Sequence, residues 1–200
     1  MIDFIKKAIS HIVIKSQMGD WGGHKWKSRF KSFGMGSEIG YPSIMPDASH
    51  ISIGNNCLIL SNSRIQNYPC GNNNPEIVIG DHCIIGYHFT ILNASKVELG
   101  KDVLIASHVI ITSENHSIDP ECELPYMNQP LQSKPVKICD GCWIGEKVCI
   151  LPGVSIGTKS IIGAGSVVTK SVPDYCIAVG NPAKVIKKYN FETHNWESVS

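Results

Sequence analysis

The chain has 200 residues, of which 18% are charged, and its formal net charge at neutral pH is +1. This length suits one domain with short appendages and is enough to bury a hydrophobic core. The near-balance of charge excludes any electrostatic argument for nucleic acid or another polyanion as a partner, so no nucleic acid is expected.

Residues 1–32 precede any repeat and are expected to form an N-terminal helical cap, because a solenoid needs its open first coil covered. Apolar residues recur there at helical spacing, namely Ile2, Ile5, Ile9, Ile12 and Val13. A peripheral membrane contact, aided by the nearby lysines, is the alternative. No apolar run approaches the roughly 20 residues of a spanning helix, and no signal-peptide cleavage site is visible. We therefore expect no transmembrane segment and a cytoplasmic location.

From residue 33 the sequence repeats with a period of six, and glycine often follows the repeated apolar residue. The clearest series is Ile138, Ile144, Ile150, Ile156, Ile162 and Val168. Upstream series with the same step are Phe33, Ile39, Met45; Ile53, Ile59, Ile65; Ile79, Ile85, Ile91; and Leu99, Ile105, Ile111. A period of six fits neither an α-helix nor an alternating strand. It predicts about six triangular coils of three short strands, with these side chains inside.

Two further features follow from the repeat. Cys57, Cys83 and Cys142 share the small inward position of a hexapeptide, so we interpret them as core fillers and not as metal ligands. The residues just before the inward aliphatics of one side should point outward as an apolar stripe, which predicts a subunit contact; scattered surface apolar residues are the alternative. The stripe consists of Leu58, Ile84, Leu104, Trp143 and Ile161.

The coils are interrupted by insertions near residues 66–76 and at 117–134, which should project as loops and are candidates for function. After Pro182 the segment AKVIKKYN is expected to form a closing C-terminal helix, and residues 190–200 a polar, mobile tail.

The segment at 134–189, which begins KPVKICDGCWIGEKVCILPGVSIG, closely resembles the hexapeptide-repeat acyltransferases. SENHSIDP at 113–120 resembles the catalytic-histidine motif of their sugar and polysaccharide O-acetyltransferases, of the galactoside, maltose and lipopolysaccharide types. The resemblance covers roughly residues 33–189. It implies an all-β, left-handed parallel β-helix, a homotrimer, and acetyl-CoA as co-substrate in a cleft between two subunits.

His116 is the candidate general base, by its place in this motif and at the start of a long loop. A neutral sugar hydroxyl needs a base to attack a thioester, and histidine suits that task near neutral pH. The resemblance also implies that Asn115 contacts the acceptor and that the backbone N–H of Glu146 stabilises the oxyanion. One of Glu114, Asp119 and Glu123, or instead a backbone carbonyl, could orient the imidazole.

The resemblance places His88 where related enzymes bind the acceptor with asparagine, so we expect His88 to bond the sugar; a solvent-facing ladder is the alternative. His88 and His108 should stack in adjacent coils, with Lys147 in the next. Stacked histidines also suggest the metal site of the β-helix carbonic anhydrases. The usual histidine spacing of those enzymes is not seen here, so no metal is expected.

Coenzyme A presents a pantetheine arm and phosphates. The resemblance places the arm against Ala164 and Thr169, and Trp143 at the wall of the acceptor or thioester cleft. Positive charge near the phosphates would come from three lysines, namely Lys170, Lys187 and the less clearly matched Lys184.

The sequence thus predicts an acetyl-CoA-dependent O-acetyltransferase that acts on a carbohydrate hydroxyl, best matched by a bacterial surface glycan or its precursor. Within enzymes, the rival is an N-acetyltransferase acting on a nucleotide-linked amino sugar. From another class, the rival is a trimeric scaffold without catalysis.

Overall fold

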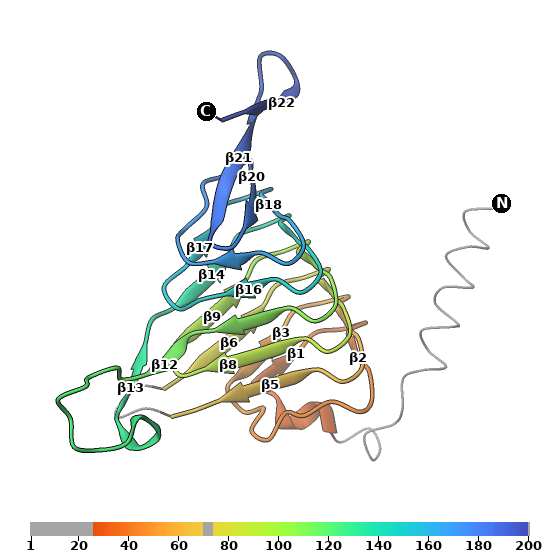
Figure 1. Ribbon diagram of the computed structural model, residues 1–200. Helices are drawn as coiled ribbons and strands as arrows, with labels where there is room; N and C mark the ends of the chain where they lie inside the picture. Colours follow the sequence, from red (N-terminus) through yellow and green to blue (C-terminus); the bar gives the residue numbers. More distant parts are fainter. Residues whose placement is uncertain (1–25, 70–73, 200) are drawn as a thin grey trace.

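The computed structural model describes residues 26–69 and 74–199. These residues form a stack of triangular coils whose strands pair in parallel into three sheets (Figure 1). The first coil reaches the third sheet only through the isolated bridge between Ile44 and Arg64. The expected left-handed parallel β-helix is confirmed. The predicted N-terminal helix lies outside the described residues, which begin with the 3-10 turn η1 (Trp26–Arg29).

The three sheets form the three sides of the stack. The first contains, in order, β1 (Ser32–Phe33), β3 (Ile51–Ile53), β6 (Glu76–Ile79), β9 (Lys96–Leu99), β14 (Val136–Ile138) and β17 (Ser155–Ile156). The coil strands of the second are β2 (Glu38–Ile39), β4 (Leu58–Ile59), β7 (Ile84–Ile85), β10 (Leu104–Ile105), β15 (Trp143–Ile144) and β18 (Ile161–Ile162). The third contains β5 (Arg64–Asn67), β8 (Thr90–Asn93), β11 (Ile110–Thr112), β16 (Cys149–Ile150) and β19 (Val167–Val168).

The hexapeptide period sets both the strand register and the core. Ile59, Ile85, Ile105, Ile144 and Ile162 are paired side by side in successive coils, and all five are at most 1% exposed. The aliphatics of the other series from Ile53 to Val168 are buried as well, while Phe33 is only partly buried. Identical positions therefore stack along the axis, which is what a repeat that cannot bury its apolar face alone requires.

The corners between sheets need unusual backbone conformations. His88, His108 and Lys147 occupy the same corner in three coils with φ values of +56°, +59° and +58°. Elsewhere glycine allows neighbouring coils to approach, since a Cβ on Gly80 would lie 2.5 Å from the carbonyl oxygen of Gly100.

The inward cysteines fill the core as expected. Cys57, Cys83 and Cys142 are buried free thiols. The Sγ of Cys142 donates to the carbonyl of Gly157 at 3.0 Å, and burial raises the pKa of this thiol to about 11.

The predicted C-terminal helix is wrong. Residues 183–190 form strand β21 (Ala183–Asn190), which pairs antiparallel with β20 (Cys176–Gly180) and with β22 (Asn195–Ser198). The open edge of the second sheet offers unpaired backbone groups to AKVIKKYN, and a helix would leave them unused. The predicted mobile tail 190–200 is also wrong, because β22 pairs with β21 and the Tyr189 and Trp196 rings meet edge to face at 5.3 Å. This arm projects beyond the last coil (Figure 1).

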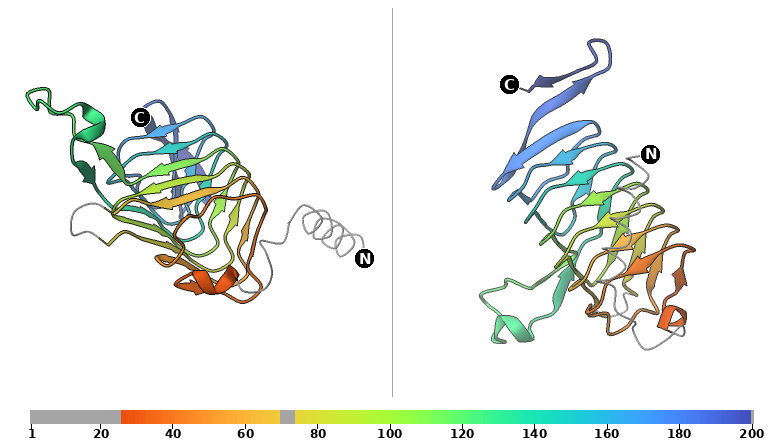
Figure 2. Two further views of the ribbon diagram at one scale, coloured as in Figure 1. Left: turned by 90° about the horizontal axis from the view of Figure 1, so that it is seen from below. Right: turned by 90° about the vertical axis from the view of Figure 1, so that its right-hand side faces the viewer.

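The 117–134 insertion is a second projection. The chain leaves the third sheet through β12 (Glu114–His116) and returns through β13 (Leu131–Ser133), with the short turn η2 (Tyr126–Asn128) between them. Figure 2 shows this loop standing off the side of the stack.

Candidate active site

His116 lies at the base of the projecting loop, where β12 pairs antiparallel with β13 and His116 is opposite Leu131. The next residue, Ser117, donates its backbone N–H to the carbonyl of Pro130 at 3.0 Å, so the two limbs are still joined one residue further out. The His116 side chain is exposed. A paired strand thus holds the imidazole at the surface, where a substrate could reach it.

The predicted acidic partners of His116 are not placed to orient it. Within residues 26–69 and 74–199, no ion pair or hydrogen bond joins the imidazole to Glu114, Asp119 or Glu123. Asp119 instead accepts the backbone N–H of Glu121 at 2.9 Å, as a turn within the loop. Asn115, opposite Gln132, is exposed beside His116.

The predicted stacking of His88 and His108 is confirmed, with ring centroids 4.7 Å apart and planes within 8°. Both side chains are exposed, and Lys147 continues the same corner in the next coil. The stack therefore presents two imidazole edges and one ammonium group to solvent, all able to bond polar groups of a ligand.

Glu146 lies at this same corner, and its surroundings single out its backbone N–H. The N–H of Tyr87 donates to Ser107 Oγ at 3.1 Å, and the N–H of Ser107 donates to Glu146 Oε2 at 3.2 Å. The next coil places Ala164 there, which has no side-chain acceptor. In the part of the chain that the structure describes, no acceptor is recorded for the N–H of Glu146. That donor is free for a ligand oxygen, as an oxyanion site requires.

One chain does not bring all these residues together. His88, Glu146 and Ala164 lie at the corner between the second and third sheets, whereas His116 leaves the corner between the third and first sheets. The exposed Thr169 and Lys170 follow β19 and so share the corner of His116, two coils further along. Residues of the two corners could line one cleft only if a second chain brought its own corner alongside.

The apolar stripe is present as predicted. Leu58, Ile84, Leu104, Trp143 and Ile161 are direct neighbours across successive strands. Ile84, Leu104 and Trp143 are 48%, 44% and 50% exposed. Trp143 therefore belongs to the stripe as well as to the strand that leads to Glu146.

The remaining lysines lie on β21, where Lys187 is opposite Ile177 and Lys184 opposite Val179. Both are exposed, and neither is in an ion pair among the described residues. Unpaired exposed ammonium groups are available to phosphates.

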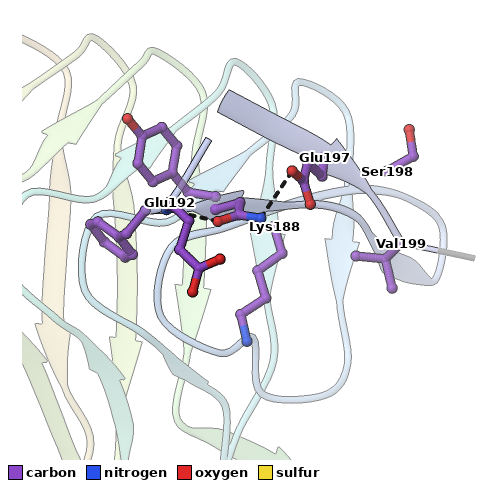
Figure 3. Close-up of a pocket in the computed structure, with 8 residues that line it drawn as sticks. Lys188, Glu192, Glu197, Ser198 and Val199 are labelled. Carbon is purple, nitrogen blue, oxygen red and sulfur yellow. Dashed lines mark hydrogen bonds between the residues drawn. The ribbon is translucent and has the colours of Figure 1, made fainter. Parts of the chain in front are cut away.

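Sequence reasoning missed a hollow of about 510 Å³ on the C-terminal arm, lined in part by Lys188, Glu192 and Glu197 (Figure 3). Asn190 Nδ2 and the Thr193 hydroxyl both donate to Glu197 Oε1, and these bonds lower the pKa of that carboxyl. The hollow contains none of the predicted site residues. The helix expectation for 183–190 concealed it, because the pairing of β21 with β22 brings residues 188–192 and 197–199 together.

Across the described ranges, no group of three or more His, Cys, Asp and Glu side chains is placed to hold a metal ion. No helix among those residues is long and apolar enough to span a membrane.

Comparison with known proteins agrees with the repeat. The family profile described as bacterial transferase hexapeptide (six repeats) matches residues 135–170. The chain is 40% identical over 127 residues to WbbJ of Escherichia coli strain K12, provisionally named an O-acetyl transferase of lipopolysaccharide biosynthesis; the match spans 60% of this chain and 65% of WbbJ. It is 39% identical over 115 residues to the galactoside O-acetyltransferase of the same strain, spanning 58% of this chain and 55% of that protein.

A solved structure shares the architecture. A hexapeptide-repeat-containing acetyltransferase from Vibrio cholerae O1 biovar eltor, solved with acetyl coenzyme A, gives a TM-score of 0.57 at 26% identity over 82% of this chain and 74% of that one.

Coils of hexapeptides closed by a paired arm, with a histidine at the root of an inserted loop, define a parallel β-helix that carries a candidate active site. The chain is thus similar to hexapeptide-repeat acetyltransferases in its repeat, in its aligned sequence and in its architecture. It spans between about half and two thirds of the length of the curated relatives that it matches.

Proposed function

We propose that this protein transfers an acetyl group from acetyl-CoA to a carbohydrate hydroxyl, with His116 as general base. The observation that carries the proposal is the exposed His116 at the root of a paired loop, in a chain 40% and 39% identical to two proteins named as O-acetyltransferases. The name of WbbJ supports a surface polysaccharide or its precursor as acceptor.

The residues supply the parts of an acyl transfer. His116 would take the proton of the acceptor hydroxyl as its oxygen attacks the thioester carbonyl. The free N–H of Glu146 would donate a hydrogen bond to the oxyanion of the tetrahedral intermediate. As the C–S bond breaks, the imidazolium would return its proton to the departing thiolate. His88 and Asn115 would bond the acceptor, while Trp143, Ala164 and Thr169 would border the thioester and the pantetheine arm.

The separation of the two corners supports a homotrimer in which neighbouring subunits share each site. A cyclic arrangement would place the His116 corner of one subunit against the His88 and Glu146 corner of the next. The apolar stripe, whose member Trp143 lies three residues before Glu146, would be buried between them.

The kind of acetyl bond in the product, ester or amide, distinguishes O-acetyl transfer from N-acetyl transfer. Incubation with acetyl-CoA and a panel of glycans and nucleotide-linked amino sugars is expected to give a product whose acetyl group is released by mild alkali, as an ester is. An alkali-stable amide, formed only on amino sugars, would establish N-acetyl transfer instead.

Removing the positive charge near the coenzyme should weaken its binding. Lys170→Ala and Lys187→Ala are each expected to raise the KM for acetyl-CoA by about 3- to 30-fold, because a charge-assisted bond to phosphate is lost. Steady-state kinetics at low and moderate ionic strength would measure this, and salt should shrink the difference. Lys188→Ala is the control, since Lys188 lies next to Lys187 on β21 and points to the opposite face. An equal effect in all three variants would remove the phosphate role.

A charge in the apolar stripe should break the assembly. Leu104→Glu is expected to turn a trimer into monomers, since an interface cannot bury an unpaired carboxylate. Light scattering after gel filtration would measure the mass. Ile110→Glu provides the control, because Ile110 is 41% exposed on the third sheet, away from the stripe. A Leu104→Glu protein that keeps the wild-type mass would contradict the interface.

A further inference from the structure

A row of polar side chains, two of them fully buried, follows the corner between the third and first sheets and ends where the His116 strand departs. Asn67, Asn93 and Ser113 each stand two residues after a buried isoleucine of the third sheet, in three successive coils. Asn67 and Asn93 are paired in register. Asn93 and Ser113 are both 0% exposed, in a core built mainly from apolar side chains. Buried polar groups destabilise a fold unless they are hydrogen-bonded, so this row calls for an explanation.

Ser113 and Asn93 form one connected network. The Ser113 hydroxyl donates to Asn93 Oδ1 at 2.5 Å and accepts the backbone N–H of Ala94 at 3.0 Å. Asn93 Nδ2 donates to Asn67 Oδ1 at 2.9 Å and to the carbonyl of Glu76 at 3.2 Å. The network thereby links the departing strand to the two coils before it.

The backbone of Ser113 is the hinge between coil and loop. Its N–H donates to the carbonyl of Leu92 at 3.0 Å, which is coil pairing. Its carbonyl accepts the N–H of Lys134 at 2.9 Å, which joins the departing limb to the returning one. The following residues form β12, whose last residue is His116. The orientation of Ser113 therefore fixes the direction in which β12 leaves the coil.

We propose that Ser113, held by Asn93, is a positioning residue that sets the place of the His116 imidazole. The assignment rests on the proposed role of His116, which no acidic side chain of the described residues orients. Because the imidazole lacks such a partner, its placement depends on the anchoring of its strand. A displacement of about 1 Å in a reacting group can lower turnover about 100-fold.

The test compares Ser113→Ala with Ser160→Ala. Ser160 is also 0% exposed, donates to the carbonyl of Pro173 at 2.7 Å and accepts the N–H of Cys176 at 3.1 Å. Loss of its hydroxyl should therefore disturb folding to a similar degree, but far from β12. Ser113→Cys, which replaces the hydroxyl by a somewhat larger and weaker donor, is the second variant in case Ser113→Ala does not fold.

We expect Ser113→Ala to lower kcat by about 10- to 100-fold and to leave the KM for acetyl-CoA within about twofold of the wild-type value. The kcat of Ser113→Cys should lie between those of Ser113→Ala and the wild type. Ser160→Ala should match the wild type in both constants. Hydrogen exchange of the amides at 114–117 should rise in the Ser113 variants and stay unchanged in Ser160→Ala. Wild-type kcat in the Ser113 variants while His116→Ala is inactive would overturn the positioning role, and so would unchanged exchange. Hydrogen exchange needs no substrate, so it tests the anchoring of β12 even in a protein without activity. A wild type that transfers no acetyl group would overturn the proposed function and not the anchoring.

Discussion

Replacing His116 with alanine is expected to lower kcat for acetyl transfer by about 10²–10⁴-fold, the usual contribution of a general base. The KM for acetyl-CoA should change little, because the proposed coenzyme contacts come from Thr169, Lys170 and Lys187. Thiol release under saturating acetyl-CoA and acceptor would measure the effect.

His50→Ala provides the matched control for this loss. His50 is a half-buried histidine just before β3, on the first sheet and outside the proposed site. Its replacement should leave kcat near the wild-type value. If His116→Ala retained most of its activity on hydroxyl acceptors, His116 would not be the base. If activity survived only on amino sugars, the result would favour N-acetyl transfer, because a free amine is already a nucleophile and depends less on a general base.

The second large effect concerns stability. Ile105→Ala is expected to reduce the free energy of unfolding by about 2–5 kcal/mol, because it opens a cavity in a close-packed core. Ile105 is 1% exposed and lies between Ile85 and Ile144 in the adjacent coils. Backbone hydrogen bonds fix the spacing of the neighbouring coils, so these coils cannot collapse into the cavity.

Urea unfolding at a fixed protein concentration would measure this change. Ile110→Ala is the control, because Ile110 is 41% exposed on β11, and it should cost less than about 1 kcal/mol. Equal losses in the two variants would show that the inward and outward positions are not distinguished as the hexapeptide period requires.

The hexapeptide period was enough to predict the coil and its core. Each turn of the coil uses the same local geometry, so a position such as Ile105 has the same surroundings as Ile85 and Ile144. For the same reason the stack of His88 on His108 and the apolar stripe could be predicted from position alone.

The C-terminal arm was mispredicted because nothing in AKVIKKYN itself excludes a helix. What decides its conformation is the open edge of β20, a tertiary feature that local spacing does not contain. The hollow beside Lys188 and Glu197 was missed for the same reason.

Sequence reasoning proposes members of the candidate site but not their arrangement. His116, His88 and Glu146 come from the family resemblance and the repeat, but the period does not reveal that they occupy two different corners. Likewise, the free N–H of Glu146 depends on Ala164 in the coil above, and the anchoring of Ser113 depends on Asn93 in the coil below. These are contacts between coils and become visible only in the folded chain.

The most direct test of the central claim is acetyl-CoA-dependent thiol release by the wild-type chain, measured with and without a panel of glycans. We expect thiol release to require an acceptor and to yield an alkali-labile acetyl ester on the glycan. Absence of both acetyl transfer and acetyl-CoA binding would contradict the central claim, and would leave a β-helix scaffold in place of an enzyme.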